Sequence, residues 1–180
     1  MFDFTNPNVS VDDWIESSDT IRDVGKSKAT LVLQKTQKFQ RAVFFTLLNP
    51  QPNGAAFAGV RVQTNWDLSS YDSLKIRCRG QGQNKGYKIV LSHKNQPKDG
   101  VNYEQTFDAT MSSETFSDVI LPLNAFEPYK WGKKVDNYEP LDRSSLSSFG
   151  FQIYGGVYSP IKQSGVSALE IENIEAYKED

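Results

Sequence analysis

Apolar and polar residues alternate along most of this chain, and this alternation limits the possible folds more than any other feature of the sequence. Successive side chains of a β-strand point to opposite faces, so a repeat of two residues is typical of strands that bury one face. The alternation predicts about nine strands, which cover Ala29–Leu33, Ala42–Leu48, Ala55–Thr64, Ser73–Arg79, Gly86–His93, Val101–Phe107, Phe116–Leu121, Ser148–Tyr154 and Ser167–Tyr177.

Turn residues and the lack of long helical patterns complete the fold prediction. Short helical turns are expected near Val11–Glu16 and Pro122–Phe126, and neither could cover a parallel sheet. We therefore expect an all-β fold, an antiparallel β-sandwich, with residues 1–180 in a single domain and its core at residues 14–177. The turn signals between strands are Asn49-Pro50, Pro52–Gly54, Gly80–Gly82, Pro97–Gly100 and Gly155-Gly156. We interpret Gly80–Gly82 as a tight hairpin.

The composition excludes several functional classes. Twenty Lys and Arg against 22 Asp and Glu give a net charge of -2, without the basic excess that nucleic-acid binding requires. No apolar run approaches the roughly 18 residues of a membrane span. The first residues resemble neither a signal nor a transit peptide, so an intracellular protein, cytoplasmic or mitochondrial, is expected. Cys78 follows the core alternation and should be buried, and His93 is the only histidine, which excludes most zinc sites.

The alternation also separates a core face from a polar outer face. If the strands are neighbours, the outer face carries a set of hydrogen-bonding side chains suited to a polyhydroxylated ligand. Two further residues are candidates for ligand binding. Glu104 is the best internal partner for Arg77 and Arg79, and Trp131 lies in the long irregular stretch Glu127–Ser145. The outer-face set comprises Arg61, Gln63, Arg77, Arg79, Gln152 and Tyr154.

A catalytic or metal site has weaker support in the sequence. The motifs of the common hydrolases, metalloproteases and nucleotide-binding enzymes are absent. A glycosidase or lyase would require a cleft formed by the loops around Trp131 and several carboxylates. No cofactor is predicted apart from a structural calcium ion, for which the candidate oxygen ligands are Asp19, Asp23, Glu170 and Glu172.

Several segments together resemble the NADH:ubiquinone oxidoreductase intermediate-associated family over nearly the whole chain. The strongest block is Asp67–Gly82, where the family has a similar strand that ends in Arg-Gly-Asp-Gly. The other segments that carry the resemblance are Trp14, Ser18-Asp19, Asp23–Ser27, Phe57–Arg61, Tyr103–Phe107, Leu121–Phe126, Leu146–Phe151 and Leu169–Ile174.

The resemblance implies a galactose-binding-like jelly roll, similar to family 11 carbohydrate-binding modules. It also implies a non-catalytic assembly factor or chaperone for the mitochondrial respiratory enzyme. Two hypotheses follow for the function. The chain is an interaction module that binds a protein client, such as a complex I intermediate, through a sheet face or end loops; alternatively, it is a carbohydrate-binding module that uses the polar outer face.

Overall fold

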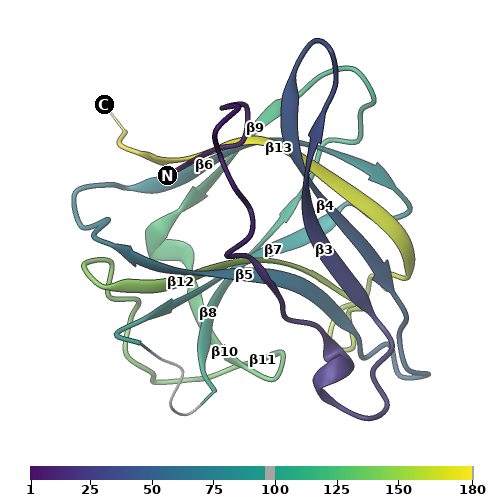
Figure 1. Cartoon of the computed structure of the whole chain (residues 1–180). Helices are drawn as coiled ribbons and strands as arrows, with labels where there is room; N and C mark the ends of the chain where they lie inside the picture. The colour runs from purple at the N-terminus through teal and green to yellow at the C-terminus, as the bar shows by residue number, and fades with distance from the viewer. Residues whose placement is uncertain (96–99, 180) are drawn as a thin grey trace.

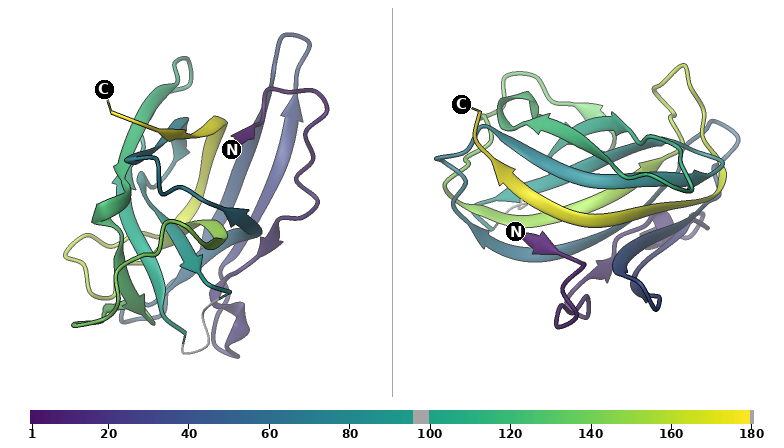
Figure 2. Two further views of the ribbon diagram at one scale, coloured as in Figure 1. Left: turned by 90° about the vertical axis from the view of Figure 1, so that its left-hand side faces the viewer. Right: turned by 90° about the horizontal axis from the view of Figure 1, so that it is seen from above.

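Two antiparallel sheets packed face to face form the protein in a computed structural model, which describes residues 1–95 and 100–179. The six-stranded sheet has the order β3 (Lys28–Lys35), β4 (Gln40–Leu48), β13 (Gly165–Tyr177), β6 (Ser73–Gly82) and β9 (Ser117–Pro122), with β1 (Phe2–Asp3) also paired to β13. The seven-stranded sheet has the order β11 (Lys133–Lys134), β10 (Glu127–Lys130), β8 (Asn102–Asp108), β7 (Gly86–His93), β12 (Leu146–Tyr154), β5 (Phe57–Trp66) and β2 (Ile15–Glu16). Figures 1 and 2 show the two layers.

The all-β antiparallel sandwich predicted from the alternation is confirmed. Each of the nine predicted strands corresponds to a long strand of the structure, whereas the short strands β1, β2, β10 and β11 were not predicted. The helical turn expected at Pro122–Phe126 is the 3-10 helix η2 (Leu123–Ala125). The helical turn expected near Val11–Glu16 is wrong: Ile15 and Glu16 form β2, and the other 3-10 helix, η1 (Asp19–Ile21), follows them. In the described part of the chain, no helix has the length and apolar character needed to cross a membrane.

One turn prediction is wrong. Gly80–Gly82 forms the end of β6 instead of a hairpin turn, and the chain turns only after Gly82. The strand continues because the residues from Gly80 to Gly82 pair with β13 along their length. Gly82 has a φ of +96°, which glycine adopts at little cost, and it ends the strand. Of the turn predicted at Pro97–Gly100, the residues Pro97–Asp99 lie outside the described residues.

The inward faces of both sheets form one hydrophobic core. Leu74, Ile76 and Cys78 of β6 are completely buried, as their alternation predicts. From the opposite sheet, Phe149 and Phe151 of β12 pack into the same cluster. Burial of each such side chain stabilises the fold by about 1.5–3 kcal/mol. The core therefore fixes the two sheets, and the outer face of each is available for other roles.

Candidate functional site

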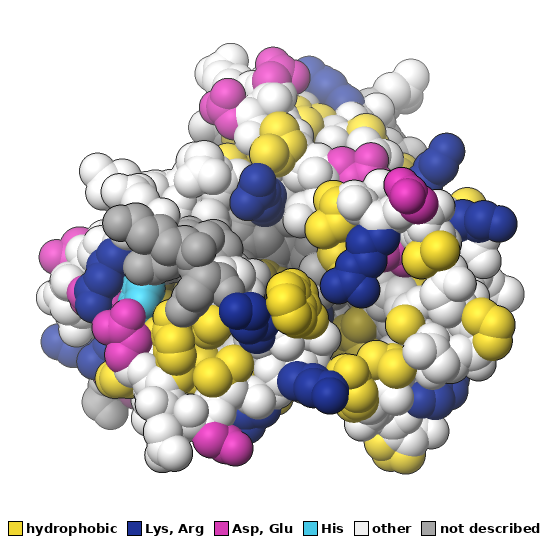
Figure 3. All heavy atoms as spheres, turned by 90° about the horizontal axis from the view of Figure 1, so that it is seen from below, with side chains coloured by type: hydrophobic (Ala, Val, Ile, Leu, Met, Phe, Trp, Pro, Cys, Tyr) yellow, Lys and Arg dark blue, Asp and Glu magenta, His cyan; other side chains and the backbone are white. Residues whose placement is uncertain are grey.

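An open groove of about 830 Å³ crosses the outer face of the seven-stranded sheet. Its floor is formed by β5, β12, β7, β8 and β10. Its walls are the segment after η1, the turn at residues 156–159 and the tip of the β10–β11 hairpin. Figure 3 views the molecule from below and shows a hollowed face around which hydrophobic side chains, Lys and Arg gather.

Strand register arranges the floor of the groove in rows of side chains. One row runs through Gly59, Gln152, Lys88 and Thr106. The next row runs through Arg61, Gly150, Val90, Glu104 and Glu127. At Gly150 a Cβ atom would lie 2.8 Å from the carbonyl oxygen of Val60, so a larger residue would push β12 and β5 apart. The floor thus combines polar groups with positions that carry no side chain.

Trp131 occupies an unusual backbone conformation at the rim of the groove. Lys130 pairs with Lys133, so Trp131 and Gly132 form a two-residue hairpin turn, with φ angles of 52° and 80°. Such a turn requires positive φ at both positions and favours Asn or Gly at the first. A bulky residue there costs about 1–2 kcal/mol. The indole is nevertheless 76% exposed, so it gains little from burial in return.

Three tyrosines extend the aromatic surface that Trp131 begins. Tyr129 and Tyr154 are half-buried, and Tyr158 is 62% exposed. Burial raises the pKa of Tyr154 and of Tyr129, so both hydroxyl groups stay protonated and can donate a hydrogen bond near neutral pH. Together the four rings provide flat apolar surfaces with polar edges, which suits both extended peptides and sugars.

The structure divides the predicted outer-face set between the two sheets. Arg61, Gln152 and Tyr154 line the groove, as do Glu104 and Trp131. Gln63 lies on β5, the same strand as Arg61 and two residues further along. Arg77 and Arg79 instead lie on β6, in the other sheet. The alternation assigned each residue to the outer side of its strand, but it held no information on which strands share a sheet.

The predicted pairing of Glu104 with the two arginines is wrong. Glu104 pairs with Lys88 of the adjacent strand β7, with an Oε2–Nζ distance of 2.5 Å. Arg77 pairs instead with Glu172 at 2.8 Å and with Asp118 at 3.3 Å. Since β8 and β6 belong to different sheets, no pair between Glu104 and the β6 arginines can form across neighbouring strands.

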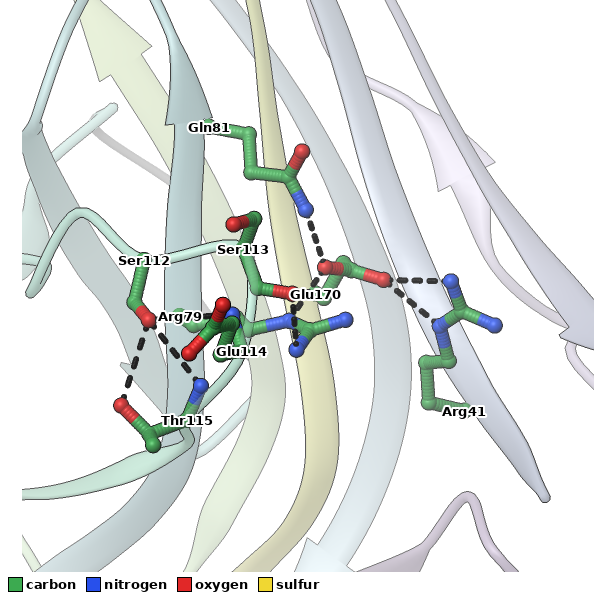
Figure 4. A network of polar contacts seen from close by, with 8 residues as sticks. All are labelled: Arg41, Arg79, Gln81, Ser112, Ser113, Glu114, Thr115 and Glu170. Atoms are coloured by element: carbon green, nitrogen blue, oxygen red, sulfur yellow. Dashed lines mark hydrogen bonds and ion pairs between the residues drawn. The ribbon is translucent and has the colours of Figure 1, made fainter. Parts of the chain in front are cut away.

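Arg79 belongs to a buried polar network on the outer face of the six-stranded sheet, shown in Figure 4. The Glu170 carboxylate accepts hydrogen bonds from Arg79, Arg41 and Gln81. Burial alone would raise the pKa of Glu170, but the hydrogen bonds and charges of Arg79 and Arg41 outweigh it and hold the pKa below its usual value. The Arg79 guanidinium also lies 4.4 Å from the centre of the Phe116 ring. This network has a structural role, because protein groups occupy its carboxylate.

The four candidate calcium ligands already have protein partners or lie apart. Asp19 accepts hydrogen bonds from the Ser27 amide and hydroxyl groups, at 2.9 and 2.8 Å. Glu170 and Glu172 pair with arginines, and Asp23 is exposed. No group of three or more His, Cys, Asp or Glu side chains within residues 1–95 and 100–179 is placed to hold a metal ion.

Calcium is therefore expected to leave the unfolding midpoint unchanged. A site with calcium present at 1,000 times its dissociation constant would add about 4 kcal/mol to the free energy of unfolding. Thermal melts with millimolar calcium and with a chelator test this expectation. A rise of several degrees with calcium would contradict it and would support the four carboxylates as calcium ligands.

Cys78 and His93 both lie buried and away from the groove. Burial raises the pKa of the Cys78 thiol to about 12, which removes the reactive thiolate near neutral pH. Burial also lowers the pKa of His93, whose Nδ1 accepts a hydrogen bond from the Asp142 amide at 2.7 Å. Neither residue lines the groove.

Several groove residues were not among the predicted candidates. Gly132, which follows the candidate Trp131, carried a recognisable signal, since a Gly in the second position of a two-residue loop is typical of hairpins. Lys88 lies on the polar side of the alternation in its strand, but it was not among the predicted site residues. Arg22 and Tyr158 had no sequence signal, because they come from irregular segments that approach the groove only in three dimensions.

A two-sheet antiparallel sandwich of this kind is the architecture of carbohydrate-binding modules of families 11 and 30. The family 11 module of the cellulosomal cellulase Lic26A-Cel5E of Clostridium thermocellum has a TM-score of 0.69 and 13% identity, over 99% of this chain and 94% of that one. The Clostridium thermocellum family 11 module in complex with a β-1,3-1,4-mixed-linked tetrasaccharide has a TM-score of 0.66 and 13% identity, over 98% and 97%. The agarase AgWH50C has a TM-score of 0.59 and 13% identity, over all of this chain but 25% of the enzyme.

These identities show the fold alone, and the sequence provides the family. The family described as complex I intermediate-associated protein 30 (CIA30) matches residues 2–171. The chain belongs to this family, which confirms the resemblance seen in its sequence. Among curated proteins, no sequence matches the chain.

Proposed function

We propose that this protein is a non-catalytic binding module that binds a protein client through the groove of the seven-stranded sheet. The observation that supports this proposal most strongly is Trp131. A bulky side chain held at positive φ costs stability, and burial returns little of it because the ring is exposed at the rim of a groove; such costs concentrate at functional sites. The family suggests the class of client, namely an intermediate in the assembly of respiratory complex I.

The groove is suited to an extended segment of a partner. It opens to solvent, and it combines aromatic rings on its rim and floor with amide, hydroxyl and charged groups on its floor. Aromatic side chains dominate the affinity of many protein interfaces, and polar groups around them fix the orientation of the partner. The absence of the common catalytic motifs from the sequence agrees with a binding role.

The change Trp131→Asn is expected to abolish client binding while leaving the free energy of unfolding unchanged or raising it by up to about 1 kcal/mol. Asn tolerates positive φ, so the hairpin keeps its shape and loses only the indole. The measurement is capture of complex I subunits by the tagged protein from a mitochondrial extract, beside denaturant unfolding of the same variant.

Two control variants accompany this test. Trp131→Tyr keeps an aromatic ring at the rim and should retain most of the capture. Tyr177→Ala removes an aromatic ring from β13, in the other sheet, and should leave capture unchanged. Full capture by Trp131→Asn, or an equal loss in Tyr177→Ala, would contradict the proposal.

A carbohydrate is the second candidate ligand of the same groove. The observation that favours it is the combination of four aromatic rings with the uncharged polar side chains Asn102, Thr106 and Gln152, which suits stacking and hydrogen bonding to a sugar chain. A glycan array that includes mixed-linked β-glucans tests this alternative. Specific binding that is lost in Trp131→Asn would support it over a protein client.

A further inference from the structure

The charges around the groove are unbalanced. Among residues 1–95 and 100–179, the two carboxylates that line it pair with lysines, Glu104 with Lys88 and Glu127 with Lys134. The same part of the chain places further cations there: Arg22 and Arg61 line the groove, and Lys130 and Lys133 lie at its rim.

None of these four cations forms an ion pair with a residue in the described part of the chain. The Lys130 ammonium lies 5.1 Å from the centre of the Trp131 ring, and the Lys133 ammonium lies 5.2 Å from the centre of the Tyr158 ring. Both lysines are therefore held beside the aromatic rim. Because the protein as a whole carries a net charge of -2, the positive charge of the groove is local.

Cations on the other sheet are paired only in part. On β6, Lys75, Arg77 and Arg79 all have acidic partners, whereas Lys28 on β3 forms no ion pair with a described residue. Unpaired cations around one concave surface add to its positive potential, which the concave shape focuses and salt screens over about 8 Å at physiological ionic strength. An anionic ligand would use that field.

The groove also presents aliphatic groups that a purely charged ligand would leave in contact with water. Ile21 is 79% exposed at one wall, and Val90 and Val157 line the floor and the opposite wall. A polyuronate chain has carboxylates but no apolar side chains to cover these residues. An acidic peptide with interspersed apolar residues has both.

We propose that the groove binds an extended, acidic polypeptide segment whose carboxylates contact Arg61 and the neighbouring cations while its apolar side chains pack against the rim. This assignment rests on the proposed function as a protein-binding module. Four intervals between the five floor strands, at about 4.8 Å each, give a width of about 19 Å. An extended peptide of about six residues spans that width.

Fluorescence anisotropy with labelled peptides of about eight residues tests the proposal. One peptide alternates Asp or Glu with Leu or Val, and a second replaces each acid by its amide. The acidic peptide should bind at least about tenfold more tightly than the amide peptide, because each charge-assisted hydrogen bond contributes about a factor of 10 to 100. Its affinity should fall when salt rises from about 50 to 300 mM.

A matched pair of charge reversals locates the effect. Arg61→Glu should weaken binding of the acidic peptide by about 10- to 100-fold or more. Lys28→Glu changes the net charge equally at an exposed position of β3, in the other sheet, and should change the affinity less than about twofold. Circular dichroism and a thermal melt of both variants establish that they are folded.

Three outcomes would overturn the assignment: no binding of the acidic peptide, equal affinity for the acidic and amide peptides, or an equal loss in Lys28→Glu. Tighter binding of an oligogalacturonate than of the acidic peptide would also overturn it, in favour of an anionic glycan. If Trp131→Asn loses client capture and Arg61→Glu keeps it in full, the acidic nature of the ligand is rejected and the protein-binding groove is not. Full capture by both variants rejects the protein-binding groove itself.

Discussion

Replacement of Glu170 by glutamine is expected to lower the free energy of unfolding by about 3–5 kcal/mol. The carboxylate is 3% exposed and is the common acceptor for Arg41, Arg79 and Gln81. Without it, two guanidinium groups lie buried with no counter-charge, and one nitrogen of Arg41, Nη1, already lacks a partner among the described residues. The cost is therefore that of uncompensated buried charge. Urea unfolding of the variant measures it.

Glu172→Gln is the matched control for this substitution. Glu172 pairs with Arg77, whose side chain is 42% exposed, and an exposed ion pair contributes about 0–1 kcal/mol. A loss in Glu170→Gln no larger than that in Glu172→Gln would show that the buried network does not stabilise the fold.

The same network predicts a pH dependence. The folded-state pKa of Glu170 lies below the usual carboxyl value of 4.5, so the unfolded state binds the proton more readily. The stabilisation is complete above pH 4.5 and is lost as the pH falls through the folded-state pKa. Wild type should lose stability over this range more steeply than Glu170→Gln, and parallel curves would contradict the prediction.

Phe151→Ala is expected to cost about 3–5 kcal/mol through the cavity that it leaves in the core. The ring is 1% exposed on the inward face of β12 and lies directly beneath the groove floor. It stacks on Trp14 with ring centres 6.0 Å apart and packs against Phe44 and Phe149. None of these rings can fill the space without leaving its own contacts. Differential scanning calorimetry or urea unfolding measures the loss.

Phe45→Ala is the matched control, because it removes the same side chain from an exposed position. Phe45 lies on the outward face of β4 and is 43% exposed, so its removal should cost less than about 1 kcal/mol. Similar losses in the two variants would mean that the alternation does not separate the core from the surface.

The alternation predicted the faces of the strands because side-chain direction is a local property. Cys78 is buried, and Arg61 and Arg77 face outward, as expected. Which strands share a sheet, by contrast, is not a local property of the sequence. β5 lies beside β12 and β6 beside β13, although each pair is separated by many residues in the chain. No repeat of two residues can encode such pairings, and the outer-face set was therefore wrongly combined.

The site was predicted in part for the same reason. Arg61, Gln152 and Tyr154 are on adjacent strands and share a face, so the alternation was sufficient for them. The groove walls come from η1, a turn and the β10–β11 hairpin, whose two- to four-residue elements are too short to show a pattern. The left-handed conformation of Trp131 could be found only from the backbone, and it is the feature that gives the site its functional interpretation.

The position of β13 determines when this protein can fold during synthesis. It is the last strand in the chain, yet it lies in the interior of its sheet, bonded to β4 on one side and to β6 on the other (Figure 1). While residues 165–177 are still inside the ribosome, β4 and β6 have no strand between them and expose their edges and apolar faces. The nascent chain is thus an aggregation-prone intermediate until this segment emerges. We therefore expect the open sheet of the nascent chain to need shielding by chaperones until residues 165–177 have left the ribosome.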